Sequence, residues 1–174
     1  MWYNVDINKM VMIVGVVVIG AMFFVAQVKA LEISSERKNA IVTRCDIIKD
    51  DLKNLQHRDS RARIYLGRYY ENILNKFITP LNMRLVENNL VNNDLIGNQD
   101  NFAKTRTNFI IDYIEYQKVL ENLVATDCKN EPAKFYERLE SARLKRGIVS
   151  KDVSKLRALA GEQLNLVDVL KGTL

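Results

Sequence analysis

An uncharged run of nineteen residues between Lys9 and Lys29 is the feature that most limits how this chain can fold. As an α-helix the run would be roughly 28 Å long, which matches the hydrocarbon thickness of a bilayer. A lone segment in lipid must satisfy its own backbone hydrogen bonds, and only a helix does so. The run therefore predicts a transmembrane helix from Met10 to Val28 that contacts the lipid bilayer.

The alternative for the same segment is a cleavable signal peptide, with residues 28–30 as the cleavage site. The apolar run is longer than the usual core of a signal peptide, and Asp6 offsets the single positive charge of Lys9 before it. We therefore predict an uncleaved anchor over residues 1–30, followed by one domain over residues 31–174.

The rest of the chain has the composition and the periodicity of helices. The whole chain has Gly 7 and Pro 2, too few turn residues for an all-β fold. Apolar or small side chains recur every three or four residues from Ile41 to Phe77, interrupted only at Asp59, which predicts one long helix continuous with the membrane helix. Pro80 is expected to end that helix, because it lacks an N–H donor and disfavours a helical residue before it.

Beyond Pro80 the pattern predicts a short helix, a polar turn over residues 92–100, and a second long helix from Phe102. A third helix is expected from Pro132 to Arg146, where Gly147 would end it, and a fourth after Ser150, which can cap it. Short connections favour antiparallel neighbours. The expected fold class is all-α: an antiparallel helical bundle of about four helices, the first one long.

If the first two long helices pair in antiparallel fashion, the two cysteines lie at similar distances from the turn that joins these helices. Cys45 lies roughly 51 Å of helix before Thr79, and Cys128 roughly 41 Å after Asn101. The thiols could then meet, provided that the chain breaks at Pro80. We predict a Cys45–Cys128 disulfide, with two buried free thiols as the alternative.

Two rules disagree on which side of the membrane the domain lies. One basic residue, Lys9, precedes the span, whereas Lys29, Arg37, Lys38 and Arg44 follow it, which predicts a cytoplasmic domain. A disulfide persists in oxidising compartments and predicts the opposite. We give the disulfide more weight and predict a single-pass protein of the cytoplasmic membrane whose C-terminal domain is extracytoplasmic.

The sequence contains no nucleotide-binding, metalloprotease or serine-hydrolase motif. The single histidine, His57, is better explained as part of a polar stretch with Asp59 than as a catalytic base. Two cysteines and one histidine are too few for a structural zinc site. We predict no catalytic residue, no cofactor and no metal ligand, and therefore a protein that is not an enzyme.

One basic cluster is a candidate interaction surface, because arginine interleaved with tyrosine can bind nucleic acid, an anionic polymer or the acidic surface of a partner. A solvated helix face is the simpler interpretation, since the net charge is only +5. We do not expect nucleic acid as a partner, and we expect protein partners or a homo-oligomer. The candidate residues are Arg58, Arg61, Arg63, Tyr65 and Arg68.

Residues 59–90 (DSRARIYLGRYYENILNKFITPLNMRLVENNL) and 127–146 (DCKNEPAKFYERLESARLKR) are similar to segments of a known group of proteins. The chain resembles small uncharacterised membrane-anchored helical proteins of reduced-genome, candidate-phylum bacteria of epibiotic habit. The resemblance implies an N-terminal signal or anchor followed by a helical domain with a cysteine like Cys128. It implies no catalytic or binding residue.

These observations lead to one functional hypothesis and two alternatives. We expect a membrane-anchored extracytoplasmic protein that acts as a structural or interaction component of the cell envelope or of a surface complex. The first alternative is a ligand-sensing helical bundle that works with a separate membrane partner. The second is a cytoplasm-facing domain that binds anionic lipid or nucleic acid through its basic clusters.

Overall fold

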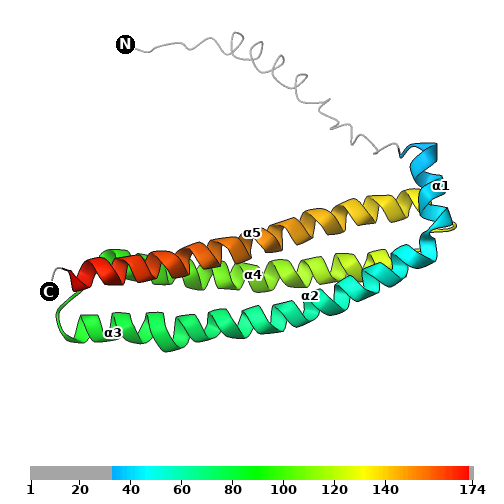
Figure 1. Cartoon of the computed structure of the whole chain (residues 1–174). Helices are drawn as coiled ribbons and strands as arrows, with labels where there is room; N and C mark the ends of the chain where they lie inside the picture. Colours follow the sequence, from blue (N-terminus) through cyan, green and yellow to red (C-terminus); the bar gives the residue numbers. More distant parts are fainter. Residues whose placement is uncertain (1–32, 173–174) are drawn as a thin grey trace, which may run out of the picture. The chain divides into compact units, whose positions relative to one another are not determined.

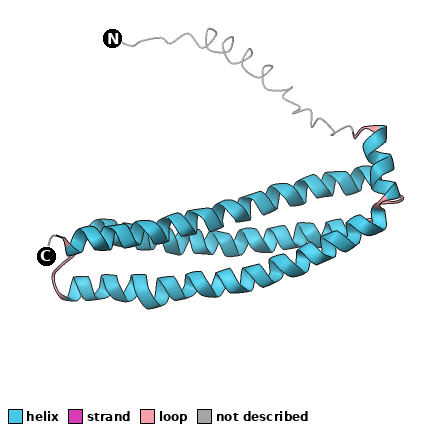
Figure 2. Ribbon diagram, in the orientation of Figure 1, coloured by secondary structure: helices cyan, strands magenta, loops and turns pink. Residues whose placement is uncertain are grey.

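A computed structural model describes residues 33–172, and this part of the chain is almost wholly helical, without a β-strand (Figure 1, Figure 2). In chain order the elements are α1 (Ser35–Thr43), α2 (Cys45–Ile73), a π-helical turn (Leu74–Ile78), α3 (Thr79–Glu87), α4 (Asn93–Ala125) and α5 (Pro132–Lys171). The arm formed by α2 and α3 lies beside α4 and α5, and successive long helices run in opposite directions. The predicted all-α antiparallel bundle is confirmed.

The predicted transmembrane helix, Met10–Val28, and the anchor segment 1–30 lie outside the described residues. Within residues 33–172, no helix is both long enough and apolar enough to cross a bilayer.

The first long helix begins later than predicted and is divided. Ser34 has an extended backbone (φ −60°, ψ 151°), and its side chain accepts a hydrogen bond from the N–H of Arg37, so it caps the start of α1. Arg44 (φ −106°, ψ 13°) then separates α1 from α2. The expected continuity with the preceding segment is therefore wrong, because the chain leaves the helical conformation at Ser34.

Pro80 does not break the first long arm. The N–H of Thr79 donates to the carbonyl of Leu74, five residues back, so the turn just before the proline is widened to a π-helix. Pro80 is the second residue of α3 and lies directly after this widened turn. The expected break, and the argument that the disulfide requires it, are both wrong.

The chain reverses instead at residues 88–92. Asn89 takes up a left-handed backbone conformation (φ 57°), which asparagine tolerates better than most residues. The side chain of Asn92 accepts hydrogen bonds from the N–H groups of Asp94 and Leu95, both at 3.0 Å, and so caps α4. The predicted turn over residues 92–100 is therefore wrong, since α4 already begins at Asn93.

Helix α5 runs without interruption through Gly147, which was expected to end a helix. No glycine among residues 33–172 has a positive φ, so the left-handed cap that favours glycine does not form here. The buried row also continues across it, from Ala142 to Leu156. The predicted third and fourth helices are one helix, and a fourth helical piece comes from α1 instead.

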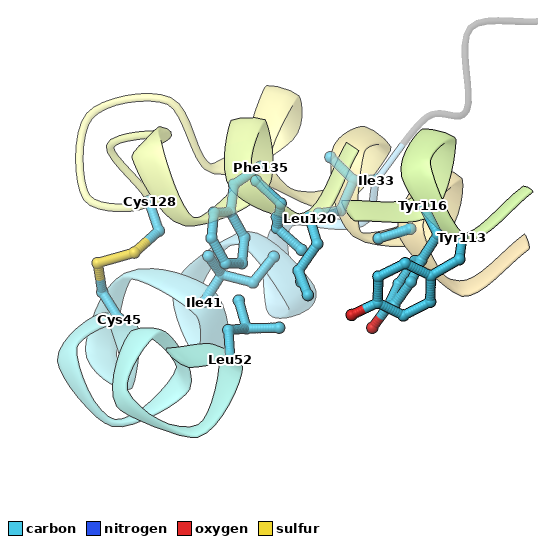
Figure 3. Close-up of a cluster of buried hydrophobic side chains, with 11 residues drawn as sticks. Ile33, Ile41, Cys45, Leu52, Tyr113, Tyr116, Leu120, Cys128 and Phe135 are labelled. Carbon is cyan, nitrogen blue, oxygen red and sulfur yellow. A yellow bond between two sulfur atoms is a disulfide. The ribbon is translucent and has the colours of Figure 1, made fainter. Parts of the chain in front are cut away.

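Helix α4 supplies more of the core than any other helix, because its buried side chains recur every three or four residues from Leu95 to Leu123. The buried apolar side chains form two clusters, one at each end of the bundle. The cluster near α1 contains Leu52, Leu120 and Phe135 (Figure 3). The far cluster consists of Tyr70, Ile78, Phe102, Phe109, Leu156 and Leu159.

Candidate functional site

A disulfide closes the α1 end of the bundle. Cys45 is the first residue of α2, and Cys128 lies in the loop between α4 and α5; their Cα atoms are 5.6 Å apart (Figure 3). Both side chains are buried. The predicted disulfide is confirmed, and the alternative of two free thiols is wrong.

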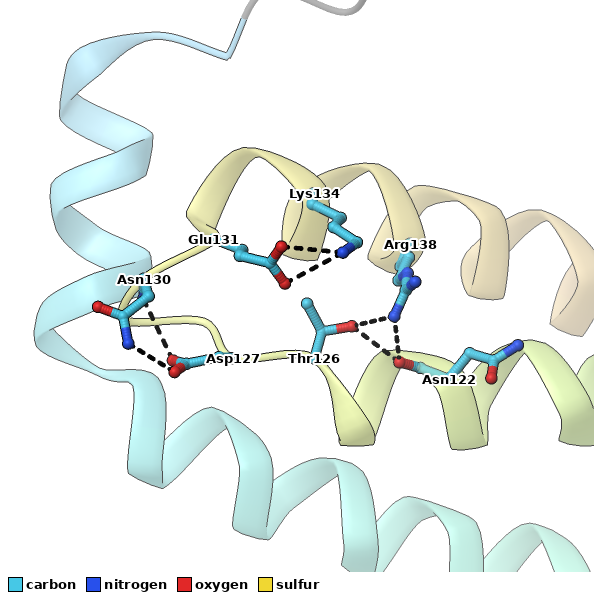
Figure 4. A network of polar contacts seen from close by, with 7 residues as sticks. All are labelled: Asn122, Thr126, Asp127, Asn130, Glu131, Lys134 and Arg138. Atoms are coloured by element: carbon cyan, nitrogen blue, oxygen red, sulfur yellow. Dashed lines mark hydrogen bonds and ion pairs between the residues drawn. The ribbon is translucent and has the colours of Figure 1, made fainter.

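The loop that carries Cys128 is held by its own polar side chains (Figure 4). The carboxylate of Asp127 accepts hydrogen bonds from the backbone N–H groups of Lys129 and Asn130 and from the side-chain amide of Asn130. The bonds from Asn130 and then from Lys129 hold the pKa of Asp127 below its usual value. These contacts fix the turn in which Cys128 points into the core.

A second set of contacts joins the two helices that flank this loop. The guanidinium of Arg138 on α5 donates to the carbonyl of Asn122 at 2.9 Å and to the hydroxyl of Thr126 at 2.6 Å (Figure 4). These acceptors lie at the C-terminal end of α4, where carbonyl groups have no partner within the helix. Arg138 therefore ties α4 to α5 directly beside the disulfide.

Further along the bundle, a polar triad joins all three long helices. Arg146 on α5 donates to both carboxylate oxygens of Asp59 on α2, from Nε at 2.8 Å and from Nη2 at 3.2 Å. The hydroxyl of Tyr116 on α4 donates to the same carboxylate at 2.8 Å. Only 17% of the Asp59 side chain is exposed, so these bonds replace the water that it loses on folding.

The electrostatics of the triad favour a charged Asp59. Burial on its own raises the pKa of Asp59, but the hydrogen bonds from Arg146 and Tyr116 outweigh burial and bring the pKa below its usual value. Burial and the bond to this carboxylate both raise the pKa of Tyr116, which keeps its proton. The triad is therefore a fixed ion pair with a neutral tyrosine.

The triad was not predicted from the sequence, although the sequence contains a signal for it. Asp59 lies seven residues from Leu52 and seven from Leu66, so it occupies the inward row of α2 rather than interrupting it. A carboxylate in an inward row needs a basic partner from another helix. His57, in contrast, is exposed on α2, as its interpretation as a solvated residue requires.

Two carboxyl groups face one another between α4 and α5. Burial, and then the neighbouring carboxyl group of Asp112, raise the pKa of Asp152 to about 6, although Lys155 opposes this shift. The proton is thus held more tightly in the folded chain than in the unfolded chain. This pair stabilises the fold at pH values below the usual range of aspartate, and that stabilisation is lost as the pH rises through about 6.

We expect the substitution Asp152→Asn to raise the free energy of unfolding by about 1–2 kcal/mol at pH 7.5, because a neutral amide removes the like-charge contact. The gain should shrink at pH 5, where the carboxyl group is already protonated. Urea denaturation of both proteins at the two pH values measures the difference. Asp100→Asn, an exposed substitution on α4, is the control, and a loss of stability in Asp152→Asn at pH 7.5 would contradict the prediction.

The structure separates the five residues of the predicted interaction surface. Arg58, Arg61, Tyr65 and Arg68 are exposed on the outside of α2, whereas Arg63 is half-buried, with its guanidinium 5.2 Å from the ring centre of Tyr113. Tyr69, which was not among the five, stacks on Tyr65 with ring centres 6.3 Å apart. We call the exposed set the arginine–tyrosine face; it consists of Arg58, Arg61, Tyr65, Arg68 and Tyr69.

Arg63 instead lines a groove on the inner side of α2. The groove is an open cavity of about 160 Å³ between α2, α4 and α5, and its lining includes the triad at one end. Within residues 33–172, no group of three or more His, Cys, Asp and Glu side chains could hold a metal ion.

No protein-family model matches the chain, and no curated protein or solved structure shows significant similarity to it. The fold and these sites define a class of protein, a disulfide-linked antiparallel helical bundle with one exposed aromatic and basic face.

Proposed function

We propose that this chain is a membrane-anchored extracytoplasmic protein whose helical bundle serves as an interaction component of the cell envelope or of a surface complex. The observation that carries the proposal is the exposed arginine–tyrosine face of α2. Tyr65 is 68% exposed and Tyr69 is 49% exposed, so the two stacked rings offer apolar contact area to a partner.

The positive charge of this face indicates the kind of partner that it would bind. No hydrogen bond or ion pair joins the guanidinium groups of Arg61 and Arg68 to any other residue in the described part of the chain. Arginine and tyrosine are enriched at protein interfaces, where the planar guanidinium binds carboxylates and the ring supplies contact area. The partner that fits the face is therefore a protein with an acidic, partly apolar surface.

The disulfide supports the extracytoplasmic location, because paired cysteines persist in oxidising compartments. The uncharged run from Met10 to Val28 would anchor the chain in the bilayer as a single span. The excess of basic residues after the run favours the opposite orientation, so the location needs a direct test. No catalytic group, cofactor or nucleic acid takes part in the proposed function.

A cysteine placed within the arginine–tyrosine face tests both halves of the proposal. Ile64 is 54% exposed and lies three residues from Arg61 and four from Arg68, so Ile64→Cys puts a thiol between them without removing them. Lys151→Cys, at an exposed position of α5, is the matched control. We expect a membrane-impermeant maleimide to label both cysteines on intact cells. The labelling rate of Ile64→Cys, divided by that of Lys151→Cys, should be several-fold lower on intact cells than in the purified chain.

The two halves fail in different ways. If neither thiol reacts until the membrane is permeabilised, the domain faces the cytoplasm and the proposed location is wrong. If both react on cells with the same ratio as in the purified chain, no partner covers the face and the interaction role is wrong.

A further inference from the structure

The groove between α2, α4 and α5 changes character along its length. Asp59, Tyr116 and Arg146 form its polar end. Seven residues away on each helix, towards the far end of the bundle, the lining is apolar. The residues of this apolar end are Leu66, Phe109 and Val153. A heptad corresponds to about 10 Å of helix, so the groove offers a polar and an apolar end within the length of a small molecule.

The carboxylate at the polar end is already paired within the triad. Asp59 accepts hydrogen bonds from both Arg146 and Tyr116. The triad therefore holds the three side chains at that end of the groove in place. It also joins the three helices that line the groove, so the cavity is formed before anything binds.

The middle of the groove holds an uncommitted cation. Arg63 lines the cavity with its guanidinium over the ring of Tyr113, and it makes no ion pair or hydrogen bond with another described residue. The hydroxyl group of Tyr113 already donates to Oγ of Ser60 at 3.4 Å, whereas Ser150 lines the same cavity with a hydroxyl that can donate a hydrogen bond. With Arg63 and Arg146 against Asp59, the groove has a net positive charge, which favours an anion.

We propose that this groove binds a small amphipathic anion, with its carboxylate at Arg63 and its alkyl chain along Leu66, Phe109 and Val153. Arginine binds a carboxylate through two parallel hydrogen bonds. The apolar end gains from contact with a chain because its side chains, although lining an open cavity, cannot hydrogen-bond water. The site is distinct from the arginine–tyrosine face, so it goes beyond the proposed interaction role.

Hexanoate is a suitable probe, because it combines a carboxylate with a short alkyl chain. The full chain, in detergent micelles and with labelled leucine and valine methyl groups, would be titrated by NMR. We expect saturable shifts at the methyl groups of Leu66, Val149 and Val153, which line the groove, and none at Leu164, which is 67% exposed on α5. Acetate lacks the chain and hexanol lacks the charge, so neither should produce these shifts at the same concentration.

A pair of substitutions separates specific binding from a general charge effect. Arg63→Gln should weaken hexanoate binding about tenfold or more, because a charge-assisted hydrogen bond is lost. Arg61→Gln, which removes the same charge from the arginine–tyrosine face, should leave the affinity unchanged. Equal affinities for Arg63→Gln and the unchanged chain, or shifts at Leu164 as large as those at Leu66, would overturn the proposal.

A second substitution keeps the test valid if Arg63→Gln disturbs the fold. Ala62 lines the groove and is exposed, so a larger side chain at this position can enter the cavity without displacing the core. Ala62→Phe should abolish the hexanoate shifts while the helical circular dichroism signal stays the same. Binding that survives in a folded Ala62→Phe protein would place the ligand elsewhere and overturn the proposal.

Discussion

Reduction of the Cys45–Cys128 disulfide should lower the free energy of unfolding by about 2–4 kcal/mol. The bond closes a loop with a sequence separation of 83, and such a long loop strongly restricts the unfolded chain. The loss should also concentrate at one end of the bundle. Helix α1 has one buried side chain, Ile41, and it lies next to α5 and just before the bonded Cys45.

Denaturation of the full chain in mild detergent, with and without reductant, measures this effect. The double substitution Cys45→Ser and Cys128→Ser should match the reduced protein, and reductant should not destabilise it further. Hydrogen exchange should speed up first in α1 and in the loop after α4. An unchanged denaturation midpoint after full reduction would show that the folded contacts alone hold this end together.

The disulfide was predicted correctly from a partly wrong argument, and the reason lies in the turn. The arm from Cys45 to Glu87 is about 63 Å long, and the return from Asn93 to Cys128 is about 53 Å. The predicted arms were both shorter, because the first was expected to end at Pro80 and the second to begin near Phe102. Both arms are underestimated by a similar length, so the difference between them stays the same. The two cysteines therefore come together in the predicted and in the observed arrangement.

These errors share a physical cause, which is that a helix-breaking residue acts only where its surroundings allow. A π-helical turn accommodates Pro80. The cap at Asn92 allows the polar segment that follows to be helical, as the start of α4. Gly147 stays helical because buried side chains continue on both sides of it. Local propensities are weak compared with tertiary contacts, and those contacts are not visible in one sequence.

The candidate sites were predictable to different degrees for a similar reason. Exposure of Arg58, Arg61, Tyr65 and Arg68 follows from their row on α2, which a helical wheel gives directly. Arg63 lies on the inner side of the same helix, so the predicted surface combined two faces. The triad needed knowledge of which helices meet, because Asp59 and Arg146 are 87 residues apart.

We expect the substitution Phe102→Ala to destabilise the bundle by about 3–5 kcal/mol. Phe102 is fully buried in the far cluster, with its ring centre 6.1 Å from that of Tyr70, which also contacts the ring of Phe109 at 6.4 Å. Ile111→Ala on the same helix is the control, since Ile111 is 51% exposed and its loss should cost less than about 0.5 kcal/mol.

We also expect the loss of stability in Phe102→Ala to be confined to one end of the bundle. The far end has no covalent link within residues 33–172, since the only disulfide there lies at the α1 end. Hydrogen exchange in the variant should therefore increase in α3 and in the ends of α4 and α5 beside it, while the disulfide end stays protected. A uniform increase along all helices would show that the two clusters unfold as one unit. In that case the covalent bond and the aromatic cluster would support the same cooperative transition rather than separate ends of the bundle.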